Sequence, residues 1–169
     1  YVAYVDDDDV FLPNHLETLV RFLQSTDFKV AYSDAWRATQ SKKDSGYETT
    51  RREVLYSRDF DYDRILAENH IPVLCVMHER SCLETSGVFD EDLGALEDWD
   101  LWIRMSRDFR FGHVSEVTCE FRWRKDGTTM TSGRKPDFVA ARQKIAGKLK
   151  GLRAVRHEKS KGKEASPAA

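Results

Sequence analysis

The chain has 169 residues, of which 40% are hydrophobic and 33% are charged, the composition of one globular, rather polar domain with a core of its own. No apolar run approaches the roughly 20 residues that a membrane-spanning helix needs. The net charge of −2 is the sum of two unlike parts. From Arg134 onward the chain is basic, with 11 Lys/Arg against 3 Asp/Glu, and the remainder is acidic, with 16 Lys/Arg against 26 Asp/Glu. This distribution argues against a dedicated nucleic-acid binder.

The first part of the chain predicts a strand, a helix and a second strand. Residues 2–5 are apolar, Pro13 suits a first helical turn, and leucines at helical spacing predict a helix over 14–25. An apolar segment over 28–32 predicts the next strand. Short joins between these elements indicate a βαβ pattern, and we expect a mostly parallel sheet. Residues 39–52 have no apolar period and predict a polar loop.

The later part of the chain predicts alternating helices and strands, and then a basic end. We expect a short helix ending near Asn69, a buried strand over 71–77, a helical turn over 80–84 closed by Gly87, a helix from Glu97, strand structure over 109–123 and an amphipathic helix over 136–149. Residues 158–169 are rich in Lys, Ser and Ala and predict a disordered tail. The three cysteines, Cys75, Cys82 and Cys119, have no CxxC spacing, and we expect reduced, buried thiols in a cytoplasmic protein.

Four consecutive aspartates, 6–9, directly follow the first apolar run. Carboxylates crowded at the end of a strand are unfavourable unless a positive charge lies there. Asp6 and Asp8 are two apart, so in a strand they share one side and can bind Mg²⁺ or Mn²⁺, which in turn can bridge a diphosphate. The alternative is a solvated acidic turn that caps the following helix.

A second acidic pair, Glu97 and Asp98, lies at the start of a predicted helix. A carboxylate held there could act as a general base, although acids in a first helical turn are also favoured by the helix dipole alone. Trp99 is a candidate for a sugar-binding wall or for the core. Of the five histidines, His78 is the best functional candidate because it ends a buried strand.

Basic residues follow the last predicted strand. Arg122 and Arg124 could hold a diphosphate through bidentate contacts, or could form an exposed basic edge. The basic segment over 142–163 could lean weakly on an anionic membrane surface, at the inner face of the membrane, or could be a solvated helix.

The segment over 4–16 resembles the strand and DxD motif of inverting family 2 glycosyltransferases with the GT-A fold. The segments over 71–78, 87–91 and 96–104 are similar to the acceptor side of that family, in the same order. The resemblance covers about 1–133, followed by a basic helix over 134–157 and the tail. It implies an α/β protein with a partial GT-A fold, in which a mixed, mostly parallel sheet has flanking helices.

The resemblance also implies roles for single residues. Asp6 and Asp7 would contact the nucleotide-sugar, and Asp8 would bind Mg²⁺ or Mn²⁺ on its diphosphate, with Asp9 in support. Asp98 would be the general base on an acceptor hydroxyl.

Three further acceptor-side residues follow from it, namely Glu97, Trp99 and His78. The implied reaction transfers a sugar from a nucleotide-diphospho-sugar to a glycan or lipid-linked acceptor with inversion, in the synthesis of cell-surface polysaccharide or glycans.

The chain departs from the family pattern in two places. A histidine ligand that many members have is absent from 121–126, where Arg122 or Arg124 is the alternative for neutralising phosphate. The family's nucleotide-binding βα units come before the DxD strand, where this chain begins. We therefore expect the chain alone to be inactive, with an exposed edge on its first strand.

Two other functions fit parts of the pattern. One is a non-catalytic glycosyltransferase-like module that binds sugars or a partner. The other is a phosphohydrolase of the haloacid dehalogenase type, with Asp6 as nucleophile and Asp8 as acid/base, but the chain offers no convincing lysine on a strand end between 30 and 90.

Overall fold

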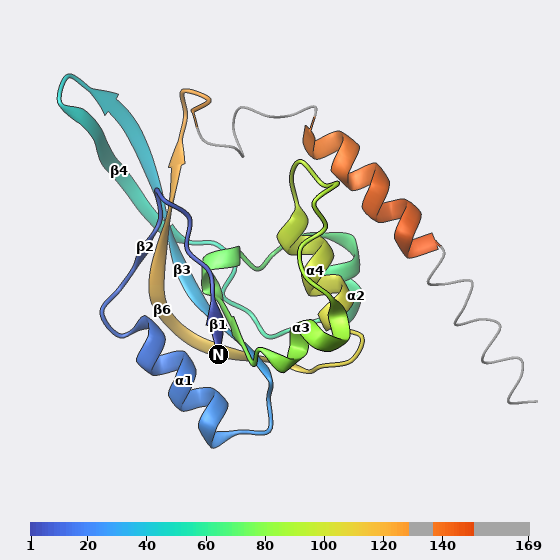
Figure 1. Cartoon of the computed structure of the whole chain (residues 1–169). Coiled ribbons are helices and arrows are strands. Elements are labelled where there is room, and N and C mark those ends of the chain that lie inside the picture. Colours follow the sequence, from blue (N-terminus) through green and yellow to red (C-terminus); the bar gives the residue numbers. More distant parts are fainter. Residues whose placement is uncertain (129–136, 151–169) are drawn as a thin grey trace, which may run out of the picture.

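The computed structural model describes residues 1–128 and 137–150, which form a curled mixed sheet with helices on both faces (Figure 1). The strands are β1 Val2–Ala3, β2 Val10–Phe11, β3 Val30–Lys43, β4 Gly46–Val54, β5 Val76–His78 and β6 Phe111–Arg124. The helices are α1 His15–Ser25, α2 Tyr62–Ala67, α3 Ser81–Ser86 and α4 Glu97–Met105, with a 3₁₀ turn at Val73–Cys75. A further helix covers 137–150.

The sheet has the strand order β1-β5-β3-β6-β2, and β4 pairs with the outer part of β3. Within the described residues, β3 and β6 form the parallel pair and the other four pairings are antiparallel. The prediction of a mostly parallel sheet was therefore wrong. β1 and β3 do run in the same direction with α1 between them, but β5, from later in the chain, lies between them and runs antiparallel to both.

The two faces of the sheet bury two separate apolar clusters. Successive side chains of a strand point to opposite faces, so Val30 and Tyr32 of β3 pack toward α2 and α4, whereas Ala31 between them packs toward α1. Leu19 of α1 is fully buried in this second cluster. A β-carbon at Gly112 of β6 would clash with the Phe22 ring, so α1 approaches the sheet closely there.

The predicted polar loop over 39–52 was wrong, because these residues extend β3 and form a hairpin with β4 (Figure 1). Its base at Thr39 and Gln40 is buried, but residues 42–52 project beyond the core and are exposed except for half-buried Thr49, so they leave no alternating apolar signal. Cross-strand pairs support it instead: Arg37 binds Glu53, and the Thr50 hydroxyl donates to the Thr39 carbonyl at 3.1 Å.

The opening segment departs from the prediction of a buried strand. Only Val2 and Ala3 pair, both are half-buried, and Val5 is exposed. β1 lies at an edge of the sheet, as expected. The strand predicted over 71–77 begins with the 3₁₀ turn, and its paired part is Val76–His78.

The remaining predicted elements are confirmed within a few residues. They are α1, α2, α3 with Gly87 as its C-cap at a positive φ of 76°, α4, β6, and the described part of the C-terminal helix. All three cysteines are free and buried. Residues 134–136, the end of the predicted basic helix and the predicted tail over 158–169 lie outside the described residues.

Candidate active site

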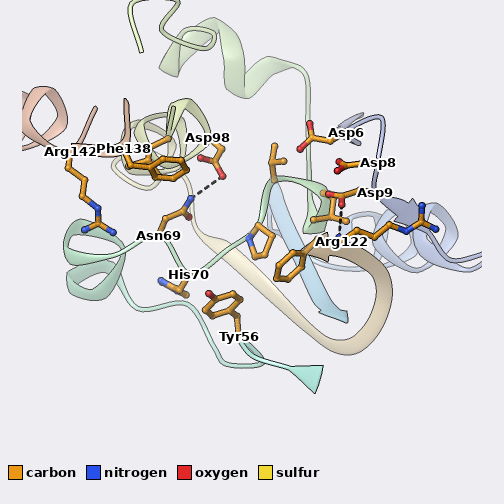
Figure 2. Close-up of a pocket in the computed structure, with 15 residues that line it drawn as sticks. Asp6, Asp8, Asp9, Tyr56, Asn69, His70, Asp98, Arg122, Phe138 and Arg142 are labelled. Atoms are coloured by element: carbon orange, nitrogen blue, oxygen red, sulfur yellow. Dashed lines mark hydrogen bonds between the residues drawn. The ribbon is translucent and has the colours of Figure 1, made fainter. Parts of the chain in front are cut away.

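A pocket of about 340 Å³ opens where the aspartate segment, the start of α4 and the helix over 137–150 converge (Figure 2). The lining comprises carboxylates, polar side chains, two arginines and an apolar floor: Asp6, Asp8, Asp9, Tyr56, Asn69, His70, Pro72, Val73, Leu74, Leu96, Asp98, Phe121, Arg122, Phe138 and Arg142. An adjoining pocket shares several of these residues and adds others, including Asp7, Glu97 and Arg124. The fold thus brings the two predicted acidic motifs to one place.

The aspartate segment forms a tight turn rather than a strand, closed by the Asp9 N–H donating to the Asp6 carbonyl at 3.2 Å. Asp6 and Asp8 nevertheless line the same pocket. Asp9 is half-buried and accepts the Arg122 backbone N–H at 2.9 Å. Burial, more than the neighbouring charges, raises the pKa of Asp9 to about 7. Arg124 lies 3.6 Å from Asp8.

Negative charge is concentrated in this part of the pocket. Burial first, and then the charges of Asp8, Glu97 and Asp7, raise the pKa of Asp6 above its ordinary value. Within residues 1–128 and 137–150, no group of three or more His, Cys, Asp or Glu side chains is arranged to hold a metal ion. Mg²⁺ commonly takes only one or two protein carboxylates and completes its shell with phosphate and water. A cation at this turn would thus take one or two carboxylates from the protein and the rest of its ligands from phosphate and water.

The Asp98 carboxylate is fixed in orientation. Asn69 donates to one carboxylate oxygen at 3.0 Å (Figure 2). The Trp99 backbone N–H donates to the other oxygen at 2.7 Å. Burial raises the pKa of Asp98 to about 6; both hydrogen bonds oppose the shift, and the charges of Glu97 and Asp6 add to it. A positioned carboxylate whose pKa lies near neutral pH has the properties of a general base.

Helix α4 presents Asp98 from its first turn. Leu96, the residue before the helix, adopts a left-handed conformation with φ 60° and ψ 23°, and its side chain lines both pockets. This conformation turns the chain sharply, so that Glu97 and Asp98 follow at once on the pocket side. Three acids in the first turn, Glu97, Asp98 and Asp100, are favoured there by the helix dipole.

Two predicted acceptor-side residues do not line either pocket. Trp99 is 4% exposed, and its indole N–H donates to the Ile65 carbonyl at 2.6 Å. His78 is fully buried. Its Nδ1 donates to the Glu79 carbonyl at 2.7 Å, so its Nε2 accepts from the Tyr4 hydroxyl, also at 2.7 Å. Both side chains have their polar atoms satisfied inside the fold, and their contact with an acceptor stays a prediction without support from this geometry.

Sequence reasoning missed one wall of the pocket. Asn69 was identified only as the end of a short helix, and the segment over 136–149 was predicted as a basic amphipathic helix with no place in the site. That helix contributes Phe138 and Arg142 to the pocket. The apolar period of the helix signalled that one face is buried, but the sequence does not reveal which part of the protein that face covers.

Comparison with known proteins identifies two related sequences, and no family model matches the chain. An uncharacterised glycosyltransferase of Bacillus subtilis, YwdF, is 30% identical over 119 residues, which cover 70% of this chain and 42% of that protein. An uncharacterised glycosyltransferase of Rickettsia bellii is 26% identical over 135 residues, which cover 80% of this chain and 19% of that protein. The chain is a distant homologue of glycosyltransferases. It spans less than half the length of either relative.

No helix within residues 1–128 and 137–150 is both long and apolar enough to cross a bilayer. On the helix over 137–150, Lys144 and Lys148 point to the protein itself. Lys144 donates to the Asp92 carbonyl at 2.5 Å, and Lys148 binds Asp90 and Asp100. The weak membrane contact suggested for this helix stays a prediction.

Proposed function

We propose that this chain carries the sugar-transfer centre of an inverting, family 2-like glycosyltransferase that uses a nucleotide-diphospho-sugar donor. One observation carries the proposal: Asp6 and Asp8 line the same pocket as Asp98, although they lie far apart in the sequence. Homology to glycosyltransferases supports the general reaction, and the arrangement of carboxylates supports the specific one.

The aspartate turn forms the donor side of the proposed mechanism. Asp8, supported by Asp9, would hold Mg²⁺ or Mn²⁺ on the diphosphate, and Asp6 and Asp7 would contact the nucleotide-sugar. When bound, the cation would stabilise the negative charge of the leaving nucleoside diphosphate. Arg124, which already faces Asp8, and Arg122 would add positive charge at the same end.

Asp98 forms the acceptor side. The oxygen of the acceptor hydroxyl attacks the anomeric carbon, the bond from that carbon to the diphosphate breaks, and Asp98 takes the hydroxyl proton. The hydrogen bonds from Asn69 and the Trp99 N–H hold the carboxylate in one orientation during this step. Attack on the face opposite the leaving group gives inversion, and the acceptor would be a glycan or a lipid-linked sugar.

The same observations bear on the two alternative functions, a phosphohydrolase and a non-catalytic module. The haloacid dehalogenase-type phosphohydrolase gains no support, because both relatives are named glycosyltransferases. A non-catalytic sugar-binding module would retain the pocket, but it would not need a carboxylate of raised pKa held by two donors. Loss of turnover on removal of the Asp98 charge distinguishes an enzyme from such a module.

The test uses the full gene product with a panel of UDP-, GDP- and dTDP-sugars, Mn²⁺ or Mg²⁺, and a panel of sugar acceptors. We expect nucleoside diphosphate release that depends on acceptor and metal, and a product of inverted anomeric configuration by NMR. Asp98→Asn and Asp8→Asn should each lower the rate by about 10²-fold to 10⁴-fold. Asp27→Asn, an exposed aspartate away from the pocket, is the matched control. Full activity in Asp98→Asn would exclude the proposed base.

A further inference from the structure

Arg142 is the cation on the side of the pocket away from the aspartate turn. Figure 2 shows Arg142 at one side, Asp8, Asp9 and Arg122 at the other, and Asp98 between them. In the proposed reaction, a donor bound at the aspartate turn would place its transferred sugar toward Asp98. A group that reaches Arg142 would then belong to the acceptor.

The guanidinium of Arg142 is placed for an anion and has none in the described structure. It lies over the Trp99 ring, 5.4 Å from the ring centre. Among residues 1–128 and 137–150, no carboxylate lies within ion-pair distance of it, although the pocket is rich in carboxylates and the other cations there have partners. Arg124 faces Asp8, and Arg122 approaches Glu120 at 3.7 Å. The N–H donors of the planar Arg142 guanidinium are thus available to a ligand.

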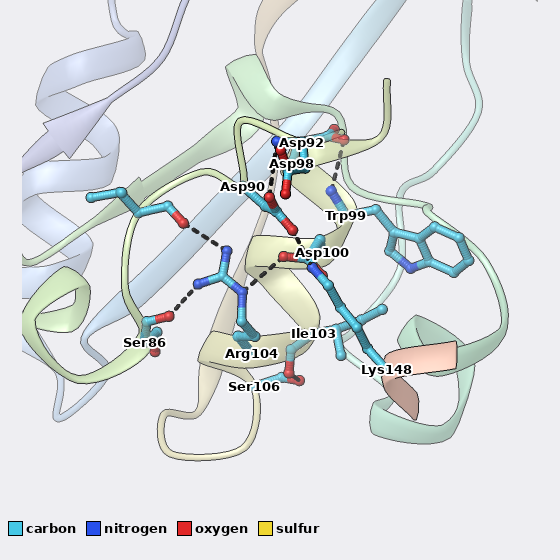
Figure 3. A network of polar contacts seen from close by, with 11 residues as sticks. Ser86, Asp90, Asp92, Asp98, Trp99, Asp100, Ile103, Arg104, Ser106 and Lys148 are labelled. Carbon is cyan, nitrogen blue, oxygen red and sulfur yellow. Dashed lines mark hydrogen bonds and ion pairs between the residues drawn. The ribbon is translucent and has the colours of Figure 1, made fainter. Parts of the chain in front are cut away.

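The helix that carries Arg142 is fixed to the body of the protein. Its apolar side buries Ala141 and Ile145, which are 2% and 1% exposed. Lys148 donates to Asp90 at 2.6 Å and to the buried Asp100 at 2.7 Å (Figure 3). The position of Arg142 beside Trp99 is therefore set by apolar packing on both sides of it and by the ion pairs of Lys148, which follows it along the helix.

We propose that Arg142 selects an anionic acceptor: it binds a carboxylate or phosphate group of the acceptor while Asp98 takes the proton of the accepting hydroxyl. The inference rests on the proposed function. A guanidinium matches the two oxygens of either anion, which a lysine cannot do. Without this cation, the carboxylates of the pocket would repel an anionic acceptor. Phe138 on the same helix, and Tyr56, offer aromatic surface to a sugar ring.

The test compares acceptors that differ only in charge. Methyl β-D-glucuronide carries a carboxylate, methyl β-D-glucoside is its neutral counterpart, and glucose 1-phosphate supplies phosphate instead. Binding to the full gene product is measured by ligand-observed NMR without a donor, and transfer is measured as kcat/KM for each acceptor. The variants are Arg142→Gln and Arg142→Lys, with Lys150→Gln as an exposed charge-removal control on the same helix.

We expect the wild type to prefer one of the anionic acceptors, and Arg142→Gln to reduce that preference about tenfold or more. Arg142→Lys should restore only part of it, and Lys150→Gln should leave it unchanged. A preference that survives in Arg142→Gln, or equal use of charged and neutral acceptors by the wild type, would overturn the inference. If no donor is turned over, the proposed function fails, and the binding arm alone decides whether Arg142 holds an anion.

Discussion

Replacing Asp98 by Asn should slow transfer about 10²-fold to 10⁴-fold and at the same time relieve an electrostatic cost of folding. The pKa of Asp98 rises from 3.8 to about 6 in the folded protein, chiefly because the carboxyl group is buried. Each pKa unit corresponds to about 1.4 kcal/mol, which sets a ceiling of about 3 kcal/mol on the cost of its charge. The side chain keeps some contact with solvent, so we expect roughly 1–2 kcal/mol.

The sign of the effect follows from proton binding. Between about pH 4 and pH 6 the folded protein holds the Asp98 proton more tightly than the unfolded chain, so the contribution of Asp98 to stability falls as pH rises through this window. Above pH 6 the full cost is present. Asn carries no charge and does not bear this cost. The free energy of unfolding of Asp98→Asn, relative to that of wild type, should therefore be higher at pH 8 than at pH 4.

Urea denaturation of wild type and Asp98→Asn at pH 4 and pH 8 measures this difference. An amide offers one acceptor oxygen to the two donors, Asn69 and the Trp99 N–H, and loss of one hydrogen bond should cost about 1 kcal/mol at both pH values. The change between the two pH values is therefore the informative quantity. If Asp98→Asn differs from wild type equally at pH 4 and pH 8, burial of the Asp98 charge does not perturb its pKa and the reasoning is refuted. Asp27→Asn is the surface control.

Three further results are expected. The kcat/KM of transfer should fall tenfold per pH unit below about pH 6 as Asp98 is protonated, and a pH–rate profile without this acidic limb would contradict its role as base. Gly112→Ala should destabilise the fold by about 1–3 kcal/mol in urea titrations, because a methyl group there meets the Phe22 ring. Lys148→Met should cost about 1 kcal/mol and speed hydrogen exchange in the helix over 137–150, because it removes one of the two basic partners that Asp100 has within the described residues. Unchanged exchange would show that apolar packing alone fixes that helix.

Local signals in the sequence located most elements and both acidic motifs. Helix α1 followed from leucines at helical spacing after Pro13, and the end of α3 followed from Gly87. These features depend on residues that are neighbours along the chain. Asp6 and Asp98 were predicted to meet because of a family resemblance, since their approach depends on the whole sheet.

The failures arose where the structure depends on long-range pairing. Nothing local shows that β5 lies between β1 and β3, because its antiparallel pairing is decided by residues far along the chain. The β3–β4 hairpin was missed because its outer part, over 42–52, is largely exposed and needs no apolar alternation. Arg142 was identified as one charge of a basic segment. Its contact with Trp99 depends on how the helix over 137–150 packs against α4, which the sequence does not reveal.

The left-handed backbone at Leu96 has a consequence for how this protein can change over time. A leucine in that conformation costs about 1–2 kcal/mol, a cost that glycine would avoid. Its side chain also lines both pockets, so a glycine there would widen them beside Asp98. Leu96 also packs against the main apolar cluster, and glycine would give up that contact and add entropy to the unfolded chain. A laboratory library selected only for heat resistance should therefore keep leucine at position 96, as should one selected for sugar transfer, because the same side chain packs the core and shapes the pocket.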